Sequence, residues 1–225
     1  MGERVAAITG GHGALGRAVV EAARAAGWTV AVIDHASGHA VPEGVLEVGG
    51  VDLTDPAQAK AAIDAVVERF GRLDALLNLA GGFVWSPVEG DGDEWDRMHA
   101  LNLKTTLNAS RAALPHLKAS AEGRIVNVGA NGAVKAGHGM GAYAASKAGV
   151  HRLTEALAEE LKSTSVTVNA VLPSIIDTAA NRADMPDADP SKWVAPADLA
   201  AVILFLASPE ARAVTGALIP VTGKV

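Results

Sequence analysis

Cysteine is absent from this chain of 225 residues. Its absence excludes disulfide bonds, thiolate metal sites and cysteine nucleophiles. Aromatic residues are also scarce, at 4% of the chain, although 49% of the residues are hydrophobic. Alanine, valine and glycine supply much of the composition, which favours helices packed closely against a parallel sheet.

The chain also lacks a basic stripe and a long apolar run. Its formal net charge of −6 at pH 7 argues against a surface that binds nucleic acid. No uninterrupted hydrophobic stretch reaches the ~20 residues that cross a bilayer, and no stretch resembles a signal peptide. We therefore expect a single domain over 1–225, located in the cytoplasm, that binds neither a membrane nor nucleic acid.

The seven histidines do not form a metal-binding pattern. None of them has the HExxH spacing of a zinc site on a helix. His35 and His39 are four residues apart, but Ser37 and Gly38 between them argue against a helix there. We expect no metal site.

Short apolar runs alternate with helical patterns along the whole chain. The expected strands are 4–8, 29–33, 75–79, 124–128, 166–171 and 218–221, with a weaker candidate at 45–51. The expected helices are 15–26, 56–70, 95–118, 142–162 and 197–207. Strands that alternate with helices and are apolar throughout indicate right-handed βαβ crossovers. The predicted fold class is α/β: a Rossmann-type, doubly wound parallel sheet in a three-layer α/β/α arrangement.

A glycine-rich turn separates the first expected strand from the first expected helix. Read from Gly11, the turn fits the GxGxxG spacing. Glycines let the backbone approach a pyrophosphate, and the helix N-terminus that follows offers unpaired N–H groups to the anion. The residues predicted to bind a dinucleotide cofactor here are Gly10, Gly11, Gly13, Ala14, Leu15 and Gly16.

Asp34 ends the second expected strand, 18 residues after Gly16. A carboxylate near this spacing accepts hydrogen bonds from the adenosine ribose and repels a 2′-phosphate. The nearby His12 and His35 provide no permanent positive charge for such a phosphate. The sequence therefore predicts NAD(H) as the preferred cofactor over NADP(H). The alternative for Asp34 is a turn residue without a role in binding.

The only tyrosine, Tyr143, precedes Lys147 by four residues. On a helix, this spacing places the phenol and the ammonium group on one face. A nearby positive charge lowers the pKa of a phenol, which makes a general acid or base usable near neutral pH. Taken alone, the pair is also compatible with an ordinary helix that has a surface lysine.

Together, the turn that begins at Thr9 and the Tyr143–Lys147 pair resemble the short-chain dehydrogenase/reductase family, over essentially the whole chain. The resemblance implies that Tyr143 supplies the proton and that Lys147 lowers its pKa and holds the nicotinamide ribose. It also implies that Asn102 supports a proton relay through water. Ala14 departs from the family's TGxxxGxG pattern, which has glycine there. Further family positions that contact the cofactor fall on Asp52, Leu53, Ala80, Gly81, Pro173, Ile176 and Thr178.

A larger departure concerns the family serine that orients the substrate carbonyl, 13 residues before the tyrosine. This chain has Ala130 there, which cannot donate a hydrogen bond from its side chain. The quinonoid dihydropteridine reductases are a branch of the family that also lacks the serine and is known for a preference for NADH. The chain resembles this branch in its glycine-rich turn, in 139–143 and in 177–193.

This resemblance implies an oxidoreductase that transfers hydride between the nicotinamide and a C=N or C=O group, with a quinonoid dihydropterin as the candidate substrate. A carbonyl or quinone reductase is the first alternative. The second is a dinucleotide-binding sensor with little catalytic activity. Ala130 favours the sensor, whereas the intact Tyr143, Lys147 and Asn102 argue against it.

The segment 174–193, rich in Asp, Ala and Pro, is expected to be a substrate lid rather than a spacer. Trp85 and Trp193 are candidates for substrate contact, as is the position of Ala130. Ordinary packing is an equal alternative for each tryptophan.

Small residues make one side of the tyrosine helix smooth, at Ala145, Ala148 and Gly149. Such a face permits close approach of another helix, either within the chain or from a second copy. With the family resemblance, it leads us to expect a homodimer or homotetramer.

Overall fold

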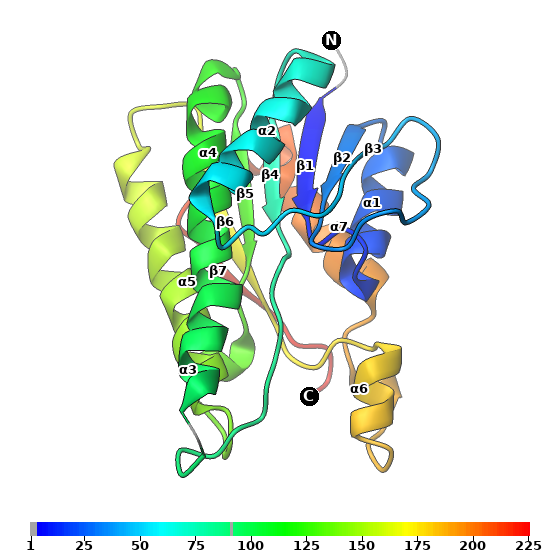
Figure 1. The fold of residues 1–225 in the computed structure, drawn as a ribbon, viewed down its shortest axis with the longest axis vertical. Coiled ribbons are helices and arrows are strands. Elements are labelled where there is room, and N and C mark those ends of the chain that lie inside the picture. Colours follow the sequence, from blue (N-terminus) through cyan, green and yellow to red (C-terminus); the bar gives the residue numbers. More distant parts are fainter. Residues whose placement is uncertain (1–3, 91) are drawn as a thin grey trace.

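The computed structural model describes residues 4–90 and 92–225. Its centre is a seven-stranded parallel sheet with helices on both faces (Figure 1). The strand order is β3-β2-β1-β4-β5-β6-β7. The strands are β1 (Val5–Thr9), β2 (Thr29–Ile33), β3 (Leu46–Val48), β4 (Ala75–Asn78), β5 (Arg124–Val128), β6 (Thr167–Pro173) and β7 (Leu218–Val221).

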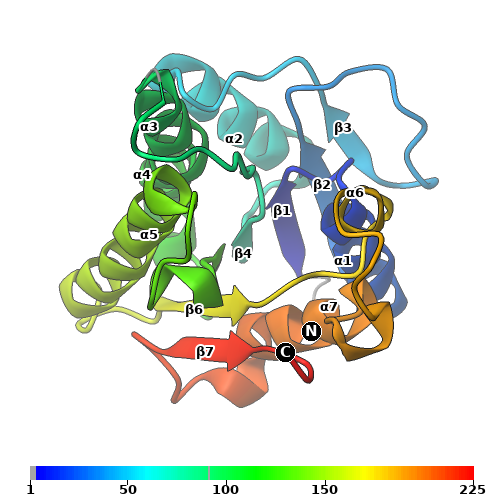
Figure 2. The ribbon, with the colours of Figure 1, turned by 90° about the horizontal axis from the view of Figure 1, so that it is seen from below.

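Two layers of helices cover the sheet. Helices α2, α4 and α5 pack on one face, and α1 and α7 pack on the other, as the view from below shows (Figure 2). The helices are α1 (Ala14–Ala25), α2 (Pro56–Phe70), α3 (Asp93–Met98), α4 (Thr105–Ala119), α5 (Gly141–Glu160), α6 (Ala179–Asp184) and α7 (Pro196–Ala207). The predicted α/β fold with three layers is confirmed.

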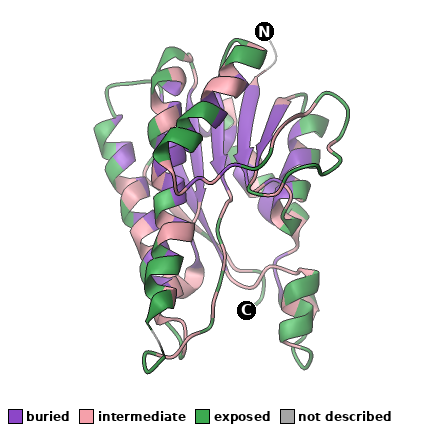
Figure 3. Ribbon diagram, viewed as in Figure 1, coloured by how far each residue is buried: buried purple, intermediate pink, exposed green. Residues whose placement is uncertain are grey.

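The central strands are buried along their length, and the helices are exposed on their outer sides (Figure 3). Every residue of β1 and β6 is buried. Strands of this kind need no alternation of polar and apolar residues, because helices cover both faces of the sheet. This explains why continuous apolar runs predicted most strands within one or two residues.

The order in which successive strands are added to the sheet changes direction at β1. Strand β1 pairs with β2 on one side and with β4 on the other. The crossovers on the two sides of such a point leave opposite faces of the sheet, which opens a crevice at the carboxyl ends of the strands. Ligands of doubly wound folds bind in this crevice, so it locates the site.

Two predicted elements differ from the structure. The helix expected over 95–118 is divided by a π-helical turn at His99–Lys104, between α3 and α4. Such turns are rare and occur mostly as single-turn bulges inside α-helices, frequently at functional sites. The segment 174–193, for which no helix was predicted, contains α6 and a 3₁₀ turn at Pro190–Lys192. Within the described residues, no helix is long and apolar enough to span a bilayer.

Candidate active site

The glycine-rich turn connects the carboxyl end of β1 to α1. A Cβ on Gly16 would lie 2.2 Å from the carbonyl oxygen of Gly10, so a side chain does not fit there. Gly10 has a φ of +68°, and a Cβ on it would lie 2.9 Å from backbone atoms of Ala80. No side chain of the described residues caps α1, whose N-cap is Gly13. The turn therefore leaves helix N–H groups for an anion, which fits the pyrophosphate of a dinucleotide.

Thr9 ties this turn to the loop after β4. Its hydroxyl oxygen accepts hydrogen bonds from the backbone N–H groups of Leu79, at 3.0 Å, and Ala80, at 3.1 Å. The predicted cofactor positions Ala80 and Gly81 are thereby held beside Gly10. The sequence places Thr9 only within a motif; its contact with the loop after β4 depends on the pairing of β1 with β4.

Asp34 lies directly after β2, next to the glycine-rich turn. One carboxylate oxygen accepts the N–H of His12 at 3.0 Å, and the other accepts the N–H of Ala36 at 3.0 Å. A carboxylate oxygen accepts more than one hydrogen bond, so the group retains capacity for ribose hydroxyls. The structure thus brings Asp34 and the glycine-rich turn together, as the sequence predicts.

The neighbouring positions Asp52 and Leu53 differ in burial: Asp52 is partly exposed, whereas Leu53 is buried. Hydrogen bonds from Thr54 lower the pKa of Asp52, whose Oδ1 accepts the N–H of Thr54 at 2.8 Å. Leu53 is only 5% exposed and packs in the core beneath α2 and α4. Their predicted contact with the cofactor stays a prediction.

Tyr143 and Lys147 lie one turn apart on α5. Lys147 is 6% exposed, and its ammonium group donates to the carbonyl oxygen of Val128 at 2.8 Å. Burial lowers the pKa of Lys147 to about 8. Burial also raises the pKa of Tyr143 to about 12, and the ring of Phe83 packs edge-on against it with centroids 5.0 Å apart.

The direction of the Tyr143 shift is a correction to the sequence analysis, which predicted a lowered pKa. The prediction considered only the charge of Lys147. In the structure, loss of hydration disfavours the phenolate and is the cause of the shift. Tyr143 therefore holds its proton at neutral pH.

Asn102 is fully buried in the π-helical turn and links three segments. Its amide accepts the N–H of Gly82 at 2.9 Å and donates to the carbonyl of the same residue at 3.1 Å. The amide also donates to the hydroxyl of Ser146 at 3.0 Å, and this hydroxyl donates to the carbonyl of Tyr143 at 2.7 Å. Asn102 thus fixes the loop after β4 to the tyrosine helix.

Gly81 lies where the predicted catalytic groups converge. A Cβ at this residue would lie 2.5 Å from Oδ1 of Asn102 and 3.3 Å from the ammonium nitrogen of Lys147. The structure therefore brings Asn102, Lys147 and Gly81 together, although they are distant in the chain. Ser146 is the link between Asn102 and the backbone of Tyr143.

Ala130, at the position of the family serine, is 3% exposed at the end of β5. Its N–H donates to Nε2 of His151 at 3.2 Å. Burial, followed by the charges of Arg152 and Lys147, lowers the pKa of His151, so the neutral ring accepts this bond. His151 is not among the residues predicted from the sequence. The repeat of four that joins residues 143, 147 and 151 on one helix face could have indicated it.

The two tryptophans predicted to contact substrate have different surroundings. Trp85 is 55% exposed and donates to the carbonyl of His138 at 3.0 Å. The backbone N–H of Ser86 also donates to the carbonyl of Gly139 at 2.8 Å, so two loops join near Tyr143. Trp193 is 7% exposed, which favours the packing alternative for this residue.

The segment after β6 is held in place by its own hydrogen bonds. The hydroxyl of Thr178 caps α6 by accepting the N–H of Asn181 at 3.1 Å. The amide of Asn181 donates to the carbonyl of Ile176 at 2.7 Å, and Ile176 forms a bridge with Val194. Together with the buried Pro173 at the end of β6, these residues form an ordered edge beside the carboxyl end of the sheet.

Within the described residues, no group of three His, Asp or Glu side chains has the arrangement of a metal site. The site brings together a glycine-rich turn at the N-terminus of α1, the carboxylate of Asp34, and Tyr143 beside the buried Lys147 on α5. This combination fits hydride transfer by a dinucleotide cofactor with proton transfer by a phenol.

Comparison with known proteins agrees with this chemistry. Residues 4–189 match the family model described as short chain dehydrogenase. The chain is 34% identical to 2-(S)-hydroxypropyl-CoM dehydrogenase 3 of Xanthobacter autotrophicus, over 97% of this chain and 95% of the relative. It is 31% identical to the 3-oxoacyl-(acyl-carrier-protein) reductase FabG of Vibrio cholerae, over 98% and 96% of the two chains.

Solved structures are similar over nearly the whole chain. The ligand-free aldohexose dehydrogenase of Thermoplasma acidophilum has a TM-score of 0.89 at 27% identity, covering 99% of this chain and 93% of that one. The 3-ketoacyl-(acyl-carrier-protein) reductase of Brucella melitensis complexed with NADH has a TM-score of 0.87 at 27% identity, covering 99% and 98%.

These relatives do not support the narrower resemblance to dihydropteridine reductases, because they are named as oxoacyl reductases and alcohol or sugar dehydrogenases. The broader resemblance is confirmed by the match over 4–189 and by the shared fold. The chain belongs to the short-chain dehydrogenase family and is an NAD(P)-dependent oxidoreductase of that type.

Proposed function

We propose that this protein is an NADH-dependent reductase that transfers hydride to the C=O or conjugated C=N group of a small molecule. The observation that carries the proposal is the Tyr143–Lys147 pair on α5, in which Lys147 is buried and its ammonium group lies beside Gly81 at the carboxyl end of the sheet. When bound, the cofactor supplies the hydride from C4 of its nicotinamide.

The residues of the chain bind the cofactor and move the proton. The glycine-rich turn binds the pyrophosphate, and Asp34 accepts hydrogen bonds from the adenosine ribose. Tyr143 keeps its phenolic proton at neutral pH and donates it to the substrate atom that gains charge. Lys147, with a pKa of about 8, is positively charged at pH 7 and offsets the charge left on the phenol. Asn102 holds the loop after β4 and the helix α5 together, and α5 carries both Tyr143 and Lys147.

Ala130 indicates which kind of substrate the site can reduce. It places a methyl group where a hydroxyl donor would support a carbonyl oxygen, and its backbone N–H is already bonded to His151. A substrate whose negative charge spreads over a conjugated ring needs such a donor less than an isolated ketone does. This supports a quinonoid ring, including a quinonoid dihydropterin, as the substrate. The exposed Trp85 and the Phe83 ring beside Tyr143 supply flat apolar surfaces for it.

A ketone or quinone reductase is the second candidate function. The names of the relatives favour it, since the Vibrio cholerae protein is an oxoacyl reductase. The sensor alternative is disfavoured by the convergence of Asn102, Lys147 and Gly81, because a protein that only binds cofactor has no need of a positioned acid.

Three further expectations belong to the proposal: NADH is preferred over NADPH, the protein forms a homodimer or homotetramer, and it acts in the cytoplasm. Asp34 supports the first. Exposed Ala145 on α5 is compatible with helix contact between copies. A Cβ on Gly149 would lie 2.6 Å from the Leu103 side chain, so this glycine serves packing within the chain. Light scattering that gives a monomer mass at micromolar concentration would contradict the proposed assembly.

The test is NADH oxidation by purified protein with quinonoid dihydropterin, quinones and simple ketones, with Tyr143→Phe as the matched control. We expect turnover of at least one conjugated substrate by the wild type and a large loss in the variant. Turnover that survives in Tyr143→Phe on a substrate that must take up a proton would overturn the assigned role. NADH binding without any turnover would favour the sensor.

A further inference from the structure

The carboxyl end of β5 is held by two side chains of α5. Lys147 donates to the carbonyl of Val128, the last residue of the strand, at 2.8 Å. One turn further along the helix, Nε2 of His151 accepts the N–H of Ala130 at 3.2 Å. Helix α5 therefore contacts the backbone of β5 both before and after Gly129.

Gly129 leaves room for the His151 ring. A Cβ at this glycine would lie 2.5 Å from Nε2 and 2.6 Å from Cδ2 of the ring, so a side chain would displace it. The N–H of Gly129 donates to the carbonyl of Val171 on β6 at 2.9 Å, which attaches this residue to the sheet. Ala130 follows and is 3% exposed, so its N–H needs a partner inside the protein. His151 supplies that partner.

His151 can accept this hydrogen bond only as a neutral ring. Because Nε2 is the acceptor, the contact assigns the ring proton to Nδ1. Burial lowers the pKa of His151 below its ordinary value of 6.5, as do the charges of Arg152 and Lys147, whereas Glu155 raises it. Within the described residues, the charged groups that act on the ring are thus all on α5, and β5 presents backbone to it. The ring is therefore neutral at pH 7.

The segment that His151 holds lies next to the candidate catalytic groups. Lys147 binds Val128, two residues before Ala130, and its ammonium nitrogen lies 3.3 Å from the position of a Cβ on Gly81. Ala130 is itself a candidate for substrate contact, because it stands at the position of the family serine. A shift of this segment would therefore move one wall of the site relative to Lys147.

The loop after Ala130 leads back to the same helix. The carbonyl of Ala130 accepts the N–H of Ala133 at 3.1 Å, in the 3₁₀ turn Asn131–Ala133. The chain then enters α5 at Gly141. Both ends of the loop are thus fixed to α5, one by the continuous chain and the other by His151.

We propose that His151 is a positioning residue for the reaction: by accepting the N–H of Ala130, it fixes the Ala130 segment relative to the Tyr143–Lys147 pair and so orients the substrate. The inference rests on the proposed function, because it assumes that the substrate binds beside Ala130. It adds a residue that acts through the backbone at the end of β5 rather than by contact with the substrate.

The experiment compares two substitutions of His151, each assayed with NADH and the best substrate of the wild type. His151→Gln retains an acceptor near the position of Nε2, whereas His151→Leu retains an apolar side chain without an acceptor. His151→Leu should lower kcat/KM about 30-fold, since a misplacement of ~1 Å costs up to ~100-fold. The dissociation constant of NADH, measured by tryptophan fluorescence, should stay near that of the wild type. His151→Gln should restore kcat/KM to near the wild-type value.

The pH profile supplies a readout that a purely structural role would not change. In the wild type, protonation of His151 removes the acceptor, so kcat should fall as the pH drops through the lowered pKa of this residue, below 6.5. His151→Gln should lack this acid limb, because an amide does not titrate. The alkaline limb, where Lys147 loses its proton, should remain in both proteins. His116→Gln, which alters a partly exposed histidine on α4, is the matched control and should keep the acid limb.

The outcomes separate this inference from the proposed function. Wild-type kinetics in His151→Leu, or the same acid limb in the wild type and in His151→Gln, overturns the inference alone. A loss in His151→Gln as large as that in His151→Leu also overturns it, because the acceptor is then not what matters. If circular dichroism shows that His151→Leu is unfolded, the comparison of the acid limbs decides by itself. Absence of NADH turnover by the wild type on every conjugated and carbonyl substrate overturns the proposed function together with the inference.

Discussion

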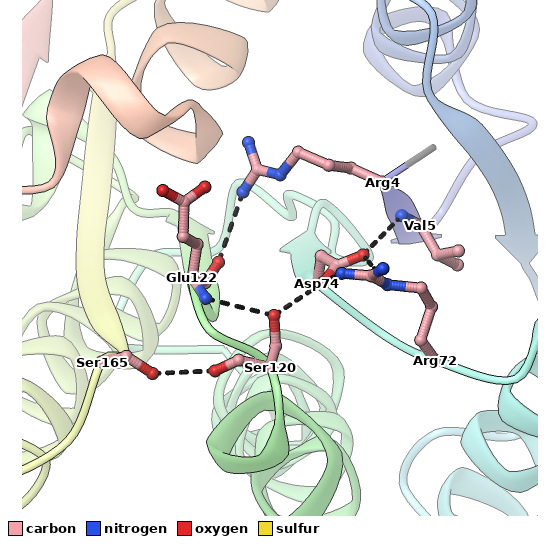
Figure 4. A network of polar contacts seen from close by, with 7 residues as sticks. All are labelled: Arg4, Val5, Arg72, Asp74, Ser120, Glu122 and Ser165. Carbon is pink, nitrogen blue, oxygen red and sulfur yellow. Dashed lines mark hydrogen bonds and ion pairs between the residues drawn. The ribbon is translucent and has the colours of Figure 1, made fainter. Parts of the chain in front are cut away.

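Charged side chains are buried at both ends of the central sheet, but their hydrogen-bond and ion-pair partners differ between the two ends. At the amino end, Asp74 is 1% exposed and its carboxylate is fully engaged (Figure 4). It accepts hydrogen bonds from the N–H of Val5 at 2.9 Å, from the hydroxyl of Ser120 at 2.6 Å, and from two guanidinium nitrogens of Arg72 at 2.8 and 2.7 Å. Burial would raise the pKa of Asp74, but the bonds from Arg72 and Ser120 outweigh it and lower the pKa.

At the carboxyl end, the buried charge lacks such compensation. Lys147 donates to the carbonyl of Val128, and within the described residues no carboxylate forms an ion pair with it. Burial is the cause that lowers the pKa of Lys147 and raises that of Tyr143. The amino end is thus organised for stability, whereas the carboxyl end keeps groups whose protonation is easily changed by a ligand. Substitutions at the two ends should therefore separate activity from stability.

The largest expected effect is on catalysis at the carboxyl end. Tyr143→Phe should lower kcat/KM about 1,000-fold, which is within the range for loss of a positioned acid. The ring that packs against Phe83 is retained, so the melting temperature and the dissociation constant of NADH should stay near those of the wild type. Steady-state kinetics measure kcat/KM, and calorimetry measures the melting temperature and the dissociation constant of NADH. A variant that unfolds at much lower temperature would show that Tyr143 is needed for the fold.

The second effect is on stability at the amino end. Asp74→Ala should reduce the free energy of unfolding by about 3 kcal/mol, because it leaves buried donors and Arg72 without an acceptor. The folded-state pKa of Asp74 is depressed, so its contribution is present above about pH 4 and is lost as the pH falls through the folded-state value. Urea titration at pH 7 and at acidic pH measures the difference between variant and wild type.

Asp64→Ala is the control for this substitution, because it removes a carboxylate from an exposed pair with Lys60. It should cost less than about 0.5 kcal/mol. The kcat of Asp74→Ala, measured where the variant is folded, should be that of the wild type. A large loss of kcat without loss of stability would contradict the division between the two ends.

The third effect has opposite signs for activity and stability. Lys147→Met should abolish most turnover but increase the free energy of unfolding at pH 7 by about 2 kcal/mol, since it removes an unpaired buried charge. The pKa of Lys147 falls from 10.5 to about 8 on folding, so between these values the unfolded wild type binds more protons. Wild-type stability should therefore rise with pH over this interval, and the advantage of the variant should shrink. A variant less stable than the wild type at pH 7 would refute the account.

The smallest expected effect concerns Ala130. Ala130→Ser should change kcat/KM less than about threefold on a quinonoid substrate, because charge that spreads over a ring gains little from one more donor. On a reactive ketone, the same substitution should improve the reaction. Kinetics of both proteins on quinonoid dihydropterin and on the ketone test this. A large gain on the ketone without any activity on the pterin would identify a carbonyl reductase that has lost its serine.

The sequence could predict those parts of the site that depend on local spacing. Tyr143 and Lys147 share a helix face because they are four residues apart, and Asp34 directly follows β2, the strand that comes after the first helix. Strands β2, β5 and β7 were predicted to the residue, since each is a short and mainly apolar run with clear ends. Such features need only the periodicity of the backbone.

Contacts between distant segments could not be predicted in this way. The bonds of Asn102 to Gly82 and Ser146 depend on a π-helical turn that the hydrophobic pattern does not show. The contact of Glu47 with His12 depends on the register of β3 against β2, in a strand of three residues that the sequence indicates only weakly. The local sequence of each segment is compatible with many contact partners, and only the packing of the folded chain decides which residues meet.

The sequence by itself determined the α/β fold, the order of strands and helices, and the residue types of the site, because these follow from apolar periodicity and short spacings. Only the tertiary structure decided how those residues behave. The charge four residues away predicts a lowered pKa for Tyr143, yet burial raises it to about 12. The amount of water around a group depends on every element packed against it, and in this site that amount outweighs the nearest charge.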